Sequence, residues 1–293
     1  MKKLSDRLVL SARSNVYHYT KDVLNFGKVL EAKFSNSNKR INAFWWSDIL
    51  NFGDLFTPDI VKSLGYIPIR ESAQQSDIVG VGSILGAVPE NYKGTILGSG
   101  IISPNTDKRY PNAHFAAARG ELTKQVLGLS PKTPTGDFGI LASKMYGSKQ
   151  KKYKVGLVPH YVDRFNPWVY RVKQRMGSDC IIIDVQDTPK TVSKKISQCE
   201  VVVSSSMHGI IVADSYNIPN VWIQLSDKVI GDGFKFHDYN SSINCEQECQ
   251  IIKSVSDVLN FDKVAVLKEP KTIERKIDEL WQIAEKEFDV LSV

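Results

Sequence analysis

The chain has 293 residues, of which 42% are hydrophobic and 24% charged, a composition typical of a globular protein with about two ordinary domains. Its net charge of +6 is mild and is not arranged in basic stripes with stacking aromatics, so we expect no nucleic-acid partner. No apolar run approaches the roughly 20 residues of a membrane span, and the run 8–12 is too short for a secretion signal. The four cysteines lack zinc-site spacing, which favours reduced thiols in a cytoplasmic protein.

Residues 1–34 carry a helical pattern, and a polar loop follows at 35–38. Strand candidates then alternate with helix candidates. The strands are expected at 41–46, 77–81, 95–97 and 113–118, and the helices at 55–64, 121–129 and 140–146. The basic run GSKQKKYK (147–154) has no apolar periodicity, which predicts a solvated linker, with an anion-binding patch as the alternative.

The same alternation restarts after this linker. Strands are expected at 154–158, 180–184, 201–204 and 221–224, helices at 167–176, 188–198 and 207–216, and a last amphipathic helix at 271–290. Alternating strands and helices predict parallel sheets that are covered on both faces. We therefore expect an α/β protein with two Rossmann-like doubly wound domains, 1–147 and 148–293, and a cleft between them. The last helix is expected to pack back on the first domain.

The segment EVVVSSSMHGIIVADSYNIPNVWI (200–223) is the most informative part of the chain. Its pattern of strand, turn, helix and strand places His208 at a helix start beyond the carboxyl end of a strand, where open α/β sheets bind ligands. Amides at a helix start favour anions, and a histidine can carry a proton or hold a phosphate. A structural histidine is the alternative.

Other polar groups follow strands or glycine turns. His160 ends a predicted strand, and Asp163 has the spacing to orient its ring. Arg119 offers a guanidinium for phosphate or carboxylate, or for a salt bridge. The run 51–54 (NFGD) either caps a helix or orients a sugar hydroxyl.

The glycine runs 80–83 and 98–100 either cradle phosphate or form tight turns, and neither completes a dinucleotide or P-loop fingerprint. A loop rich in aromatic and polar residues, with Lys235 for an anion, is expected at 233–239.

Several of these motifs, in this order, resemble the polysaccharide pyruvyl transferase family over residues 42–245. They are NFGD (51–54), GVGSIL (80–85), LGSG (97–100), ARGELT (118–123), GDFGIL (136–141), PHYVD (159–163) and MHGIIVADSYNIP (207–219). The tail KFHDYNSS (235–242) resembles the branch that acts on bacterial exopolysaccharides. Phe138 replaces the family's usual proline, and Ser206 stands where many members have arginine.

The resemblance implies a fold similar to GT-B glycosyltransferases. It also implies transfer of pyruvate from phosphoenolpyruvate to a sugar diol in a polysaccharide or lipid-linked precursor, which forms a cyclic ketal and releases phosphate. No cofactor or metal is expected beyond the co-substrate phosphoenolpyruvate. The mild positive charge and Trp45-Trp46 are compatible with peripheral attachment to the inner face of the membrane. An ordinary soluble surface is the alternative.

On this reading we assign catalysis to His208, His160 and Asp54, with His208 as the acid. The donor is assigned to Arg119, Ser205, Ser206, Gly209 and Lys235, and the acceptor to Asn51, Asp54, Gly82, Ser83, Ser99 and Asp238. Two alternatives stay open: a GT-B glycosyltransferase that uses a nucleotide sugar, and a non-catalytic carbohydrate-binding relative.

Overall fold

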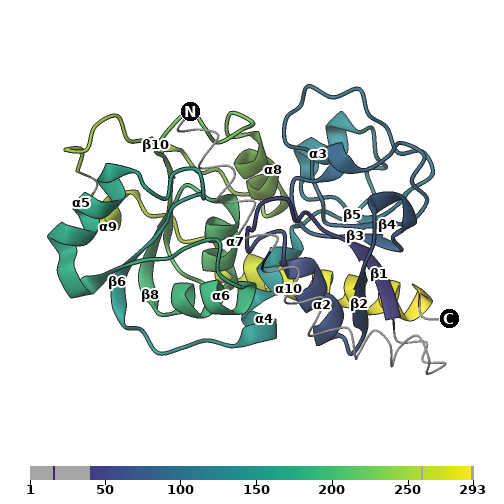
Figure 1. The fold of residues 1–293 in the computed structure, drawn as a ribbon, viewed down its shortest axis with the longest axis horizontal. Helices are drawn as coiled ribbons and strands as arrows, with labels where there is room; N and C mark the ends of the chain where they lie inside the picture. The colour runs from purple at the N-terminus through teal and green to yellow at the C-terminus, as the bar shows by residue number, and fades with distance from the viewer. Residues whose placement is uncertain (1–15, 17–39, 259, 292–293) are drawn as a thin grey trace.

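A computed structural model describes residues 16, 40–258 and 260–291. The helix and loop predicted within 1–38 therefore fall almost wholly outside the described residues. Figure 1 shows the described chain as two α/β layered halves side by side, with the C-terminal helix running beneath the first half.

The first half is built on a five-stranded parallel sheet. Its strand order is β2 (Ile67–Arg70), β1 (Arg40–Phe44), β3 (Ile78–Val79), β4 (Thr95–Leu97) and β5 (His114–Ala117). Its helices are α2 (Phe56–Ser63), α3 (Glu121–Val126) and α4 (Ala142–Tyr146), with 3-10 turns η1 (Ala73–Gln75), η2 (Leu85–Ala87) and η3 (Phe138–Leu141). Buried apolar residues dominate the central strands, as parallel sheets covered on both faces require.

The second half holds another five-stranded parallel sheet. Its strand order is β10 (Gln250–Ile251), β9 (Asn220–Gln224), β8 (Cys199–Ser204), β6 (Tyr153–Val158) and β7 (Cys180–Ile182). Its helices are α5 (Pro167–Met176), α6 (Pro189–Ser197), α7 (Met207–Ser215), α8 (Phe234–Ser242), α9 (Phe261–Val264) and α10 (Pro270–Leu291), with the 3-10 turn η4 (Gly177–Asp179). The α/β class with parallel sheets is thus confirmed, whereas the GT-B-like arrangement and the boundary at 147/148 stay predictions.

Polar contacts tie the two halves together. The Phe52 amide donates to the Val185 carbonyl at 2.8 Å, and the Ser143 amide donates to Ser215 Oγ at 2.9 Å. Helix α10 also reaches the first half, where Tyr66 donates to Asp289 at 2.9 Å. Its apolar stripe, which includes Ile273, Ile277, Leu280, Ala284 and Phe288, is buried.

Two differences from the sequence-based expectation have a local physical reason. Residues 233–239, expected as a loop, belong mostly to helix α8, whose N-cap is the left-handed Gly233. Most of the buried residues of α8 are polar, for example Lys235 and Asp238, so the segment lacks an amphipathic signal. Strand β2 was not expected because it contains Pro68, and it lies at the sheet edge, where proline is tolerated.

Candidate active site

The strand order of the two sheets decides where the site lies. Counted along the chain, both sheets have the order second, first, third, fourth, fifth. In such sheets ligands bind beyond the carboxyl ends of the first and third strands, where the connections diverge to opposite sides. Those strands are β1 and β3 in the first half and β6 and β8 in the second. The loops that follow them carry 51–54, 80–83, His160 and 205–208, which are most of the predicted site residues.

His208 lies in the first turn of α7 and is 4% exposed. Its ring is packed against the first half of the chain: a Cβ added at Gly53 would lie 1.9 Å from His208 Nδ1. The rings of Phe52 and Phe56 lie 6.1 and 6.5 Å from the imidazole, centroid to centroid. The other ring nitrogen, Nε2, lies 3.6 Å from Asp137 Oδ2. The glycine of NFGD thus provides the space that this histidine occupies.

Asp54 is buried beside the same loop. Its carboxylate accepts a hydrogen bond from Asn51 Nδ2 at 3.1 Å, and a Cβ added at Gly82 would lie 2.4 Å from Asp54 Oδ1. Burial raises the pKa of Asp54 to about 6, although His208 and Lys235 act to lower it. Asn51, Asp54 and Gly82, three of the predicted acceptor residues, therefore lie together.

His160 and Lys235 add two buried groups to this region. Burial, with help from Lys235 and His208, lowers the pKa of His160 to about 3. Burial and the charge of Arg119 lower the pKa of Lys235 to about 8, opposed by Asp54 and Asp163. At neutral pH His160 is therefore neutral and Lys235 mostly cationic. The Nδ1 atom of His160 accepts a hydrogen bond from the Val162 amide at 3.4 Å, which leaves the ring proton on Nε2.

Asp163 does not orient the His160 ring, contrary to the possibility raised by its spacing. Its carboxylate accepts instead from Ser205 Oγ at 3.1 Å and from Ser226 Oγ. Ser205 Oγ in turn accepts from the His160 amide at 2.9 Å. Ser205 thus links the loop after β6 to the loop after β8.

The N-terminus of α7 has amides available for an anion. Ser206 is its N-cap residue and makes no side-chain cap bond, and the first amides of an α-helix in general lack an i−4 carbonyl partner. The Gly209 amide, however, donates to the Ser206 carbonyl at 3.0 Å. A Cβ added at Gly209 would lie 2.3 Å from Ser204 Oγ, so this glycine allows α7 to pack closely on β8.

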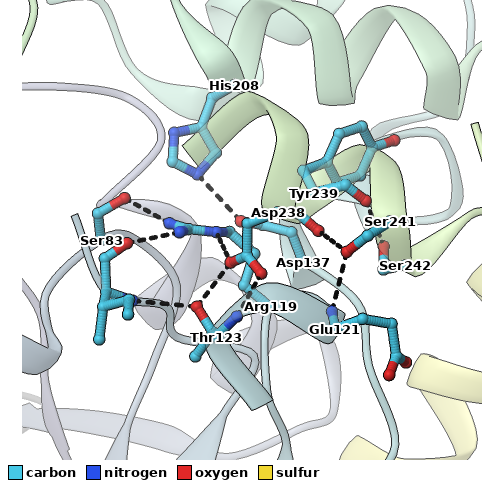
Figure 2. A network of polar contacts seen from close by, with 11 residues as sticks. Ser83, Arg119, Glu121, Thr123, Asp137, His208, Asp238, Tyr239, Ser241 and Ser242 are labelled. Carbon is cyan, nitrogen blue, oxygen red and sulfur yellow. Dashed lines mark hydrogen bonds and ion pairs between the residues drawn. The ribbon is translucent and has the colours of Figure 1, made fainter. Parts of the chain in front are cut away.

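Arg119 and Asp238 form a second, wholly buried cluster (Figure 2). Arg119 Nε donates to Asp238 Oδ2 at 2.7 Å, Nη2 donates to the Ile101 carbonyl at 2.6 Å, and Nη1 bonds Ser83 Oγ. Asp238 also accepts from the Thr123 amide at 2.7 Å and the Thr123 hydroxyl at 2.6 Å. The cluster joins α3 of the first half to α8 of the second.

Four predicted ligand residues therefore have internal partners in this structure: Arg119, Ser83, Asp238 and Ser99, whose Oγ bonds the Gly80 carbonyl. Their assignment to donor or acceptor stays a prediction. Within the described ranges, no group of three or more His, Cys, Asp or Glu is placed to hold a metal ion. Metal-free chemistry likewise stays a prediction.

Residues 1–227 match the model of the polysaccharide pyruvyl transferase family. The chain belongs to this family. The match covers both sheets' switch-point loops, so the predicted family is confirmed and the protein is a pyruvyl transferase enzyme.

Two curated relatives are similar to this pyruvyl transferase. An uncharacterised protein, L143, of Acanthamoeba polyphaga mimivirus is 32% identical over 208 residues, which are 64% of this chain and 69% of the relative. The succinoglycan biosynthesis protein ExoV of Rhizobium meliloti (strain 1021) is 28% identical over 209 residues, which are 68% of this chain and 64% of the relative. Together with the family match, this similarity supports pyruvyl transfer in polysaccharide biosynthesis.

Sequence reasoning did not place Asp137 or Thr123 at the site of this pyruvyl transferase. Asp137 has no assigned role in the motif GDFGIL, yet it is fully buried and faces His208. Its signal was the acid in GDFG, a motif that the resemblance includes.

In the part of the chain that the structure describes, no helix is both long and apolar enough to cross a membrane.

Proposed function

We propose that the enzyme transfers the pyruvyl group of phosphoenolpyruvate to two hydroxyls of one sugar, which forms a cyclic ketal and releases phosphate. The observation that carries the proposal is the convergence of His208, Asp54, His160 and Lys235 beyond the carboxyl ends of two parallel sheets, in a member of the pyruvyl transferase family. These groups are an acid, two proton acceptors and a cation.

The donor has two anionic groups, a carboxylate and a phosphate. Lys235 supplies a buried ammonium, and the first amides of α7 supply hydrogen-bond donors with the favourable end of a helix dipole. Since many family members carry arginine where this chain has Ser206, we assign to Lys235 the charge that this arginine would supply.

The reaction balances with these residues. His208 in its cationic form gives a proton to the methylene carbon, which becomes the methyl group, and C2 becomes electrophilic. One sugar hydroxyl adds to C2. The second hydroxyl then replaces the phosphate, as the bond between C2 and the phosphate oxygen breaks. Of the two hydroxyl protons, one restores His208 and the other leaves with phosphate. Asp54 and His160 accept these protons in passing, because both are partly or wholly unprotonated at neutral pH.

We assign the acceptor to the side of Asn51, Asp54 and Gly82, which lie together at the switch point of the first sheet. The acceptor is a sugar of a bacterial polysaccharide or of its lipid-linked precursor. We place the enzyme in the cytoplasm; Trp45 is buried, so peripheral attachment to the inner membrane surface rests on the mild positive charge of the chain, and an ordinary soluble surface is the alternative. Co-sedimentation with phosphatidylglycerol vesicles at low salt, lost at high salt, would support that attachment, and its absence at low salt would remove it.

The direct test is incubation with phosphoenolpyruvate and a panel of methyl glucosides, galactosides and mannosides. Phosphate release and a sugar product heavier by pyruvate less water are expected. His208→Ala should lower turnover by about 10²-fold or more. Lys235→Met should raise the KM for phosphoenolpyruvate, whereas Lys253→Met, an exposed lysine far along the chain, should not.

Binding of the donor can be followed without the acceptor. A ligand that binds the folded state raises Tm by mass action. A rise with phosphoenolpyruvate that is lost in Lys235→Met supports the proposal. A rise with a nucleotide sugar, and none with phosphoenolpyruvate, would favour glycosyl transfer instead.

A further inference from the structure

Two buried polar atoms face each other across the two halves of the molecule. Asp137 Oδ2 and His208 Nε2 have no hydrogen-bond partner among the described residues, and they lie 3.6 Å apart (Figure 2). Asp137 is 0% exposed and His208 4%. A buried polar atom without a partner is costly, so two such atoms at this separation call for an explanation. A proton on Nε2 would face Asp137 Oδ2 as its acceptor, although 3.6 Å is longer than a normal hydrogen bond.

Local structure fixes the carboxylate of Asp137. Its Oδ1 accepts from the Gly139 amide at 2.8 Å and thereby caps η3, which leaves Oδ2 for the histidine. A Cβ added at Gly139 would lie 3.0 Å from Asp137 Oδ1 and 3.3 Å from His208 Cδ2. The glycine after Phe138 therefore allows the acid and the ring to approach.

The ring itself is asymmetric in its surroundings. Its Nε2 edge faces Asp137, while Nδ1 lies against Gly53, the residue before Asp54. The flanking neighbours Phe52 and Phe56 are aromatic and offer no acceptor. The imidazole edge that faces Asp137 and the edge that lies next to Asp54, the predicted proton acceptor, are thus opposite each other.

We propose that Asp137 is a positioning residue that holds the proton of His208 on Nε2, so that Nδ1 is the nitrogen that gives its proton to the substrate. The Nδ1–H bond breaks, its proton forms the new C–H bond at the methylene carbon, and its electron pair stays on Nδ1. The Nε2 proton remains on the ring, facing Asp137. The substrate step rests on the proposed function, whereas the position of the ring proton does not.

Other charged groups act on the same ring. Asp54 and His160 interact with it from the loops after β1 and β6, and Lys235 of α8 interacts with Asp54 and His160. Asp137→Asn keeps the size and the bond to Gly139 but removes the charge next to Nε2. Because Oδ1 keeps the Gly139 bond, the new amide nitrogen faces Nε2 as a donor, and the neutral ring should move its proton to Nδ1.

The test is NMR of protein with ¹⁵N-labelled histidine. The chain has five histidines, and the His208 signals are assigned with His208→Gln. In the wild type the neutral ring should carry its proton on Nε2. In Asp137→Asn the proton should move to Nδ1. The control Asp214→Asn changes another buried acid, on α7 itself and bonded to Asn220 and Tyr239, and should leave the His208 tautomer unchanged.

A neutral wild-type ring with its proton on Nδ1, or a proton that stays on Nε2 in Asp137→Asn, would overturn the proposal. The tautomer is read in the wild type, so the result does not depend on how a variant folds. Turnover adds a second readout: Asp137→Asn should lower kcat and leave the KM for phosphoenolpyruvate unchanged. A wild type without pyruvyl transfer, but with the expected tautomer, would refute the proposed function and leave the dyad intact.

Discussion

The buried Arg119–Asp238 pair permits a quantitative test of how the two halves are joined. In Arg119→Met the side chain keeps most of its apolar stem but loses its charge and its bonds to Asp238, Ser83 and the Ile101 carbonyl. Asp238 is then left as a buried carboxylate with only the two bonds from Thr123.

Removing one partner of a buried ion pair typically costs about 3–5 kcal/mol, because the remaining charge is neither solvated nor paired. The two Thr123 bonds favour the lower end of that range. We therefore expect the free energy of unfolding to fall by about 3 kcal/mol and Tm by roughly 10 °C. Asp238→Asn in the same chain should restore part of the loss, since it removes the stranded charge.

The assay is urea unfolding followed by tryptophan fluorescence, with Arg109→Met as the matched control. Arg109 is exposed and its guanidinium bonds only backbone carbonyls, so its loss should change stability by less than about 0.5 kcal/mol. The reasoning fails if Arg119→Met unfolds at the wild-type urea concentration. If the same variant also lost the Tm rise with phosphoenolpyruvate, Arg119 would be the donor ligand that the family resemblance implies.

Three further predictions concern the site. Gly53→Ala places a Cβ 1.9 Å from His208 Nδ1 and should lower kcat by at least about 10-fold. The control Gly86→Ala has open space around its Cβ and should leave kcat unchanged. Equal kcat for both variants would contradict the close packing of His208 on Gly53. The rate with saturating acceptor should rise with pH through about 6 as Asp54 ionises and fall above about 8 as Lys235 loses its proton; a rate that is constant across these two values would exclude both roles. The pKa of His160 is lowered from 6.5 to about 3, so its contribution to stability is present above pH 6.5 and is lost as the pH falls toward 3. In that window His160→Gln should reduce the acid-induced loss of stability by about 1.4 kcal/mol per pH unit, as measured by urea unfolding at each pH. An unchanged slope of stability against pH would refute this prediction.

Local patterns in the sequence located most of the helices and strands. Helix α5 and strand β4 have the predicted bounds, and the alternation that predicts parallel sheets is seen in both halves. Periodicity succeeds here because burial on one face of a helix, or on both faces of a parallel strand, is already visible in neighbouring residues. It failed at α8, where buried polar side chains replace the apolar stripe.

The motifs also placed His208, His160 and Asp54 beyond strand ends, but only the tertiary structure shows what each of them faces. The order of the strands brings together loops that are more than a hundred residues apart, from Gly53 to His208. Whether an arginine meets a ligand or an aspartate depends on such distant neighbours: Arg119 is paired with Asp238, 119 residues along the chain. Residue type gives a side chain its chemistry, whereas burial and long-range partners set its charge state and the group on which it acts.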